Sequence, residues 1–79
     1  MPAFKDIEFP LRGDHIPLDS LLKVCAVAQS GGQAKLMVAD GLIEVDGQTE
    51  LRKTAKIRDG QIVVAAFAGV RIRVKAEQA

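Results

Sequence analysis

Two short stretches of this chain carry residue types that bind phosphate. The first is Ser30-Gly31-Gly32-Gln33, followed by Lys35. It is typical of the beginning of a helix, because the Ser30 hydroxyl can accept from the Gln33 N–H while the Gln33 side chain reaches back to Ser30. Helix N-termini present unpaired N–H groups, and glycine lets a phosphate approach the backbone closely. The alternative is that the two glycines only permit a tight corner between two helices.

The second stretch is the cationic run Arg52-Lys53-Thr54-Ala55-Lys56, which we expect in a loop between strands. Cations in a loop can converge on a nucleic-acid backbone, and such contacts need only Lys, Arg, small polar groups and amides. An ordinary solvated loop is the alternative. The surrounding charge favours a localised basic surface, since residues 51–79 hold seven basic and two acidic side chains while residues 1–50 hold four basic and eight acidic ones.

The aromatic content bears on which nucleic acid such a surface would suit. The chain has no Trp or Tyr and three Phe, and the phenylalanines lie in predicted core or edge positions. Base stacking on single strands is therefore poorly supported. Recognition of structured RNA by its shape and backbone fits better.

Catalytic and metal chemistry have almost no support. The chain has one cysteine, Cys25, and one histidine, His15, whereas a zinc site needs about four nitrogen or sulfur ligands. Cys25 lies on the apolar face of a predicted helix, where a cysteine usually acts as a small hydrophobe. Glycine-rich nucleotide-binding and nucleophile motifs do not occur. We therefore expect no enzyme, no cofactor and no metal.

Apolar periodicity predicts two helices that would position the first stretch. One is expected over residues 17–28, with five residues on a single apolar face: Leu18, Leu21, Leu22, Cys25 and Ala28. The other is expected over residues 31–40, with Gly41 as its left-handed stop. This second helix is short enough to be marginal alone, so it must pack on the first helix and on a sheet.

Two strand predictions come from local patterns in the first fifty residues. Residues 7–11 alternate apolar and polar side chains and include Pro10, which cannot donate to a ladder, so they predict an edge strand. Residues 42–45 and 48–51 flank Asp46-Gly47, a strong hairpin signal. The basic run follows directly after this hairpin.

Two further strands complete the chain. Residues 62–67 form a nearly continuous apolar run, which predicts a central strand buried on both faces. In residues 70–75 the apolar Val70, Ile72 and Val74 alternate with Arg71, Arg73 and Lys75, which predicts a strand with one basic face. We expect the last residues of the chain, 75–79, to be frayed.

These elements predict an α+β fold in one domain over residues 1–79. The expected order is strand, helix, helix, then four strands, with two packed helices against a small, mostly antiparallel sheet. The predicted core consists of Leu21, Leu22, Cys25, Ala34, Val38, Val45, Ile62 and Val64. No apolar run approaches the roughly 20 residues that span a bilayer, and the first residues carry acidic side chains rather than a signal sequence. We therefore expect a cytoplasmic protein with no membrane partner, and favour a monomer.

The span of about 18–63 resembles the small RNA-binding domain named after ribosomal protein S-four, also called the αL motif. Its joint spacing, rather than any one element, carries the resemblance: Leu18-Asp19, Leu22, Ser30, Ala34, Gly41, Val45, Asp46-Gly47, Arg52-Lys53, Lys56-Ile57 and Ile62-Val63. The details SGGQAK and VDG…RKTAKI look most like the stand-alone, YbcJ-like branch of that family, which consists of short bacterial proteins.

The resemblance implies a non-catalytic RNA-binding module for structured RNA, with ribosomal RNA or the ribosome as the partner. The RNA-binding residues that the resemblance implies are Ser30, Gln33, Lys35, Arg52, Lys53 and Lys56. The phosphate-binding argument adds Gly31 and Gly32, and Lys23 and Arg58 are secondary candidates. Many relatives carry arginine directly after the serine, where this chain has Gly31. The glycines would then clear space for an RNA backbone. We also predict that Lys35, Arg52, Lys53 and Lys56 lie on one face.

Two other functions stay open at this point. A protein-interaction adaptor could use the basic face of Arg71, Arg73 and Lys75 to meet an acidic partner. The second is a ubiquitin-like sulfur carrier, since such carriers are also small β-rich domains with Asp-Gly turns. Such a carrier needs a terminal Gly-Gly, whereas this chain ends with Glu77-Gln78-Ala79.

Overall fold

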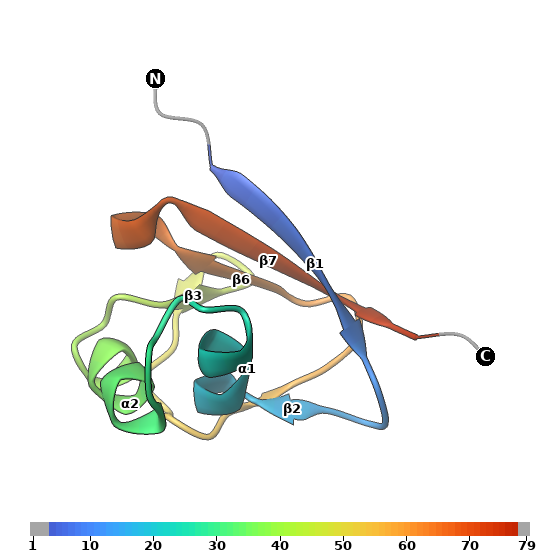
Figure 1. The fold of residues 1–79 in the computed structure, drawn as a ribbon, viewed down its shortest axis with the longest axis horizontal. Helices are drawn as coiled ribbons and strands as arrows, with labels where there is room; N and C mark the ends of the chain where they lie inside the picture. The colour runs from blue at the N-terminus through green and yellow to red at the C-terminus, as the bar shows by residue number, and fades with distance from the viewer. Residues whose placement is uncertain (1–3, 78–79) are drawn as a thin grey trace.

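Two helices lie against one face of a five-stranded sheet in the computed structural model, which describes residues 4–77 (Figure 1). The elements follow one another as β1 (Lys5–Leu11), β2 (Ile16–Pro17), α1 (Leu18–Val24), α2 (Gly31–Ala39), β3 (Glu44–Val45), β4 (Gln48–Thr49), β5 (Lys56–Ile57), β6 (Ile62–Ala65), the 3-10 helix η1 (Ala66–Ala68) and β7 (Val70–Ala76). The predicted α+β class with two packed helices is confirmed. The segment 50–56, which we call the basic loop, lies on the helix side of the sheet (Figure 1).

The strand order of the main sheet is β1-β7-β6-β3-β4. β1 pairs with β7 in parallel, and the other neighbouring pairs are antiparallel. β1 is an edge strand, as the proline at position 10 predicts. A second, two-stranded sheet of β2 and β5 was missed, because two-residue strands leave no periodic pattern in the sequence.

α1 shows that the prediction of a helix over 17–28 was too long, since the helix ends at Val24. Ala26 takes a left-handed conformation with φ 61°. Its N–H donates to the Lys23 carbonyl at 3.1 Å, and the Val27 N–H donates to the Leu22 carbonyl at 2.9 Å. These are the two hydrogen bonds of a Schellman motif, in which the left-handed residue, here Ala26, is normally glycine. An alanine there gives no sequence signal that the helix stops.

α2 begins and ends almost as predicted. Ser30 is its N-cap and accepts from the Gln33 N–H at 3.1 Å. The Gln33 side chain accepts from the N–H of Gln29 rather than from Ser30, so the predicted capping box is shifted by one residue on that side. Gly41 follows the helix with φ 74°. Its N–H donates to the Val38 carbonyl and the Leu42 N–H donates to the Met37 carbonyl, which are the same two Schellman bonds.

The core fills the space between the helices and the inner face of the sheet. Its buried members include four predicted residues: Leu21, Leu22, Ala34 and Val38. Cys25 and Val45 are half-buried and pack against this cluster. The predictions for Ile62 and Val64 were wrong. The register of β6 turns Val63 and Ala65 inward, so this central strand is buried on one face only.

Turns close the remaining connections. Asp46 and Gly47 both have positive φ, at 53° and 84°, which gives the hairpin turn predicted between β3 and β4. β6 stops at Ala65 instead of continuing to Phe67, because η1 and a left-handed Gly69 reverse the chain there. Of the tail expected to fray, Ala76 ends β7, while residues 78–79 lie outside the described residues.

Candidate nucleic-acid interface

The basic loop is attached to the beginning of α1 by backbone hydrogen bonds. The Leu18 N–H donates to the Ala55 carbonyl at 2.9 Å, and the Asp19 N–H donates to the Lys53 carbonyl at 3.0 Å. The N-cap residue of α1, Pro17, offers no capping side chain. The first amides of a helix lack partners within the helix, and a side chain at the N-cap usually accepts from one of them. In α1 the loop carbonyls accept from these amides instead.

The loop exposes Arg52, Lys53, Thr54 and Lys56 around a hollow in the surface. Ala55 and Ile57 are buried and alternate with exposed residues on this segment. The hollow has a volume of about 540 Å³, and its lining residues are Arg52, Thr54, Ala55, Lys56 and Arg58. Three of these five side chains are cationic, and Lys56 is the one of them that forms no ion pair among the described residues.

The cations of this region differ in whether a carboxylate already neutralises them. Arg52 forms a two-pronged ion pair with Glu50, and the Arg58 guanidinium lies 2.8 Å from the Asp14 carboxylate. The ion pairs among residues 4–77 do not involve four exposed lysines of the predicted site: Lys23, Lys35, Lys53 and Lys56. Lysines are therefore the cations that this region offers to a ligand.

The beginning of α2 is open to solvent. Ser30, Gly32 and Gln33 are exposed, and Gly31 is half-buried. A Cβ built at Gly31 would meet nothing within 4 Å, and one at Gly32 would meet only the Ser30 hydroxyl, at 3.9 Å. Neither glycine has positive φ. The structure does not support the tight-corner alternative, because neither packing nor backbone conformation requires glycine at these positions.

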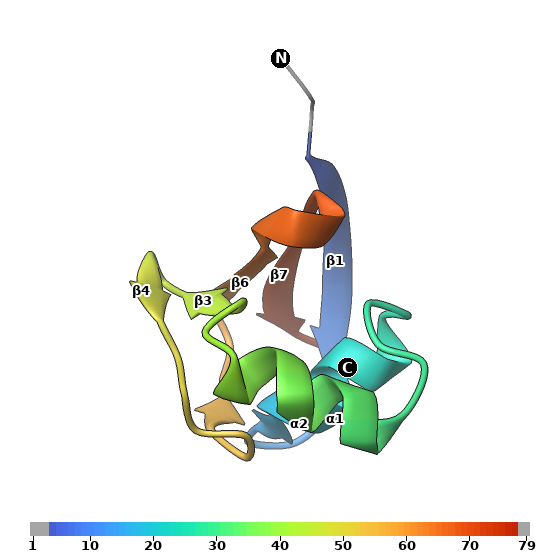
Figure 2. The ribbon, with the colours of Figure 1, turned by 90° about the vertical axis from the view of Figure 1, so that its left-hand side faces the viewer.

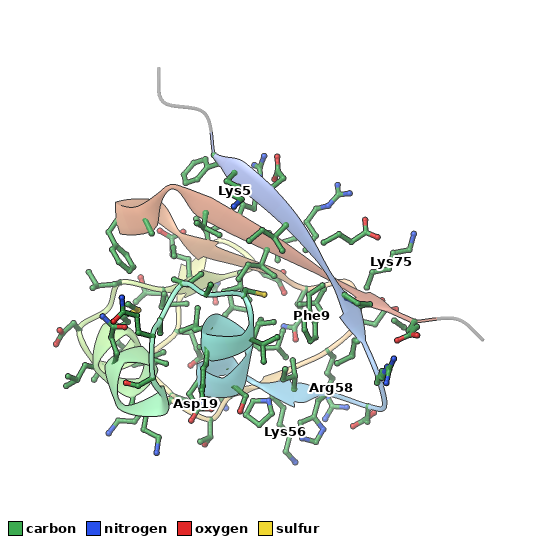
Figure 3. The ribbon with its side chains drawn as sticks, viewed as in Figure 1. Lys5, Phe9, Asp19, Lys56, Arg58 and Lys75 are labelled. Carbon is green, nitrogen blue, oxygen red and sulfur yellow. The ribbon has the colours of Figure 1, made fainter. Side chains whose placement is uncertain are left out.

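The two stretches lie on the same side of the sheet but at different ends of α2. Figure 2 shows the connector from α1 entering α2 on the right, whereas the basic loop, coloured gold, passes below the left-hand end. Lys56 and Arg58 lie along the lower edge of Figure 3, on the other side of the molecule from Lys5 and Lys75. That Lys35 shares one face with the loop cations stays a prediction.

The outer face of the sheet is not the basic surface that the sequence suggested. The parallel register places Asp6 beside Arg71 and Glu8 beside Arg73. The closest atoms of these pairs are 2.6 Å and 3.6 Å apart. The hydrogen bond from Arg71 holds the pKa of Asp6 below its ordinary value. Two of the three cations on this face are thus matched by carboxylates, which weakens the adaptor alternative.

Glu50 is the residue of this region that sequence reasoning missed. Its carboxylate accepts from the backbone N–H of Arg52 at 3.0 Å as well as from the guanidinium. These hydrogen bonds, first from the side chain and then from the backbone of Arg52, hold the pKa of Glu50 below its ordinary value. A Glu two residues before an Arg is too common in loops to have signalled this arrangement.

Cys25 lacks the environment of an activated nucleophile. Burial raises the pKa of the Cys25 thiol, whereas an activated cysteine has a lowered pKa. Residues 4–77 contain no cluster of three or more His, Cys, Asp or Glu side chains that could hold a metal ion. Among the helices of residues 4–77, none is both long enough and apolar enough to cross a membrane.

The chain belongs to the S4 domain family, whose model matches residues 9–75. Two curated relatives are YbcJ of Escherichia coli (strain K12) and YbcJ of Shigella flexneri. Each is 45% identical over 62 residues, which cover 78% of this chain and 86% of the relative.

The fold of this chain is also similar to the solution structure of E. coli YbcJ. The TM-score is 0.62 and the identity 36%, over 92% of this chain and 91% of YbcJ. That structure is described as revealing an αL motif involved in RNA binding. The resemblance to the S-four family and its YbcJ-like branch is therefore confirmed.

Proposed function

We propose that this protein is a non-catalytic RNA-binding module that recognises structured RNA by its backbone and shape. Membership of the S4 domain family and the αL motif described for YbcJ support this proposal. The observation that carries it in this chain is the basic loop, which is hydrogen-bonded to the beginning of α1 and presents Lys53 and Lys56 to solvent. Phosphate contacts of this kind supply affinity without reading sequence.

The open beginning of α2 is the second part of the proposed interface. Unpaired N–H groups at a helix N-terminus attract anions, and Gly31 and Gly32 leave room for a phosphate beside them. Within this proposal Ser30, Gln33 and Lys35 contact the RNA at α2, and Lys23 and Arg58 are secondary contacts. Within this proposal the protein acts as a monomer in the cytoplasm, and ribosomal RNA is the partner class to test first.

The lack of exposed aromatic side chains near either stretch favours structured over single-stranded RNA. Among residues 4–77, the large exposed aromatics are Phe4, beside β1, and Phe67, in η1. Neither belongs to the basic loop or to α2, and Phe4 lies against the Arg71 guanidinium. Proteins that bind single strands without sequence preference stack bases on aromatic rings.

The test compares two double variants that remove the same charge from opposite sides of the molecule. Lys53→Ala with Lys56→Ala removes two cations from the loop, and Lys5→Ala with Lys75→Ala removes two from the other side (Figure 3). We expect the loop variant alone to weaken binding of a ribosomal RNA stem-loop. Its plot of log affinity against log salt should lose about two units of slope, by analogy with duplex DNA. Equal losses in both variants, or none in the loop variant, would contradict the proposed interface.

A further inference from the structure

Glu50 links the sheet to the basic loop. Its N–H donates to the carbonyl of Ile43, just before β3, at 3.0 Å, which fixes its backbone to the edge of the sheet. Its side chain is only 18% exposed, although a glutamate in a surface loop is usually solvated. The carboxylate accepts three hydrogen bonds from Arg52: from the backbone N–H at 3.0 Å, and from Nε and Nη2 at 3.1 Å each.

Arg52 continues this connection toward α1. Its carbonyl accepts from the Ala55 N–H at 3.2 Å, which closes a turn across the middle of the loop. The carbonyls of Lys53 and Ala55, on either side of Thr54, then accept from the first amides of α1. Hydrogen bonds therefore run without a break from the sheet edge through Glu50 and Arg52 to the beginning of α1.

We propose that Glu50 and Arg52 are positioning residues of the interface, which hold the loop so that Lys53 and Lys56 meet the RNA backbone together. This inference rests on the proposed function. Arg52 acts through its two hydrogen bonds to the Glu50 carboxylate rather than as a free phosphate contact, because the Glu50–Arg52 pair has no net charge. An ordered loop binds more tightly than a mobile one, since less conformational freedom is lost on binding. The lowered pKa of Glu50 agrees with a carboxylate that stays ionised and bonded.

Two conservative substitutions separate positioning from direct contact. Glu50→Gln removes a negative charge beside the RNA, so electrostatics alone would tighten binding. Arg52→Lys keeps the positive charge but loses the fork that bonds a carboxylate at two points. If the pair positions the loop, both variants weaken binding of the stem-loop by about 3- to 10-fold, the range expected when one or two side chains lose their preorganisation. The double variant should be no weaker than either single one, because the residues act as a unit.

A matched pair on the outer sheet face provides the control. Glu8→Gln and Arg73→Lys make the same chemical changes in another Glu–Arg pair, and should leave the affinity unchanged. Melting temperatures show which variants are folded, and amide exchange at Leu18 and Asp19 reports whether the loop still caps α1. Exchange should accelerate in Glu50→Gln and in Arg52→Lys.

The outcomes distinguish this inference from the proposed function. Tighter binding by Glu50→Gln, or an affinity of Arg52→Lys within about twofold of wild type, would overturn the positioning role. If Glu50→Gln does not fold, the Arg52→Lys result decides alone. If the Lys53 and Lys56 double alanine variant binds normally, the proposed interface itself fails, whatever Glu50 and Arg52 do.

Discussion

Asp19, in the first turn of α1, donates its backbone N–H to the carbonyl of Lys53, 34 positions further along the chain, at 3.0 Å. The loop that carries the proposed RNA contacts is therefore also the cap of the first helix. A change that loosens the loop should therefore destabilise the beginning of α1. A change at the beginning of α1 should in turn destabilise the loop.

Amide hydrogen exchange should reveal this capping directly. First-turn amides of a helix normally exchange fast, because they have no partner within the helix. We expect the amides of Leu18 and Asp19 to exchange slowly, while those of Gly31 and Gly32, at the same stage of α2, exchange fast. Two-dimensional NMR after transfer to heavy water measures both pairs in one sample. Equal exchange in the two pairs would mean that the loop carbonyls do not cap α1 in solution.

Alanine at both Gly31 and Gly32 should separate stability from binding. The added Cβ atoms fit without contacts closer than 3.9 Å, and alanine favours a helix over glycine by up to about 1 kcal/mol per position. The melting temperature should therefore rise or stay level, while RNA affinity falls because the methyl groups keep a phosphate from the amides. Calorimetry and an RNA titration of the same variant check both. A clear loss of stability would instead restore the tight-corner interpretation.

The ends of the two helices offer a pair of opposite substitutions. Ala26 and Gly41 occupy the same left-handed position of their Schellman motifs, with φ 61° and 74°. Glycine tolerates this conformation, whereas other residues lose roughly 1 kcal/mol or more in it. Ala26→Gly should raise the free energy of unfolding by up to about 1 kcal/mol, and Gly41→Ala should lower it by at least a similar amount. Denaturant unfolding of both variants tests the assignment, which fails if the two changes have the same sign.

Acid should weaken the Glu50–Arg52 pair. The folded state lowers the pKa of Glu50, so the pair's contribution to stability is complete above the unfolded value of about 4.3 and is lost as the pH falls through the folded value. The wild type should therefore lose more stability between neutral pH and pH about 3 than Arg52→Ala does, since that variant lacks the guanidinium and keeps only the backbone N–H at position 52. Denaturant unfolding at the two pH values measures this difference. Equal losses would show that the pKa of Glu50 does not depend on Arg52.

Features set by near neighbours in the chain could be predicted from the sequence. Ser30 caps α2 because its hydroxyl reaches an amide three residues on. Asp46-Gly47 forms a hairpin because both residues tolerate positive φ. The missing N–H of Pro10 keeps β1 at an edge. Each depends on residue type and short spacing, which a sequence displays.

Contacts between distant segments could be decided only by the tertiary structure. The parallel pairing of β1 with β7 places Asp6 and Glu8 beside Arg71 and Arg73, so two of the three cations that make this face look basic along β7 are matched by carboxylates on β1. The early end of α1 was hidden for a different, local reason, since its last turn is closed by Ala26 in a conformation that alanine disfavours.

The candidate interface combines both kinds of information. Phosphate binding needs small, polar and basic residues wherever they lie in the fold. The two stretches that contain such residues can therefore be recognised in the sequence. The role of Glu50, and the attachment of the loop to α1, depend on backbone carbonyls and on a side chain turned toward its neighbour. Every residue has the same carbonyl, so only the path of the folded chain determines which amide it meets.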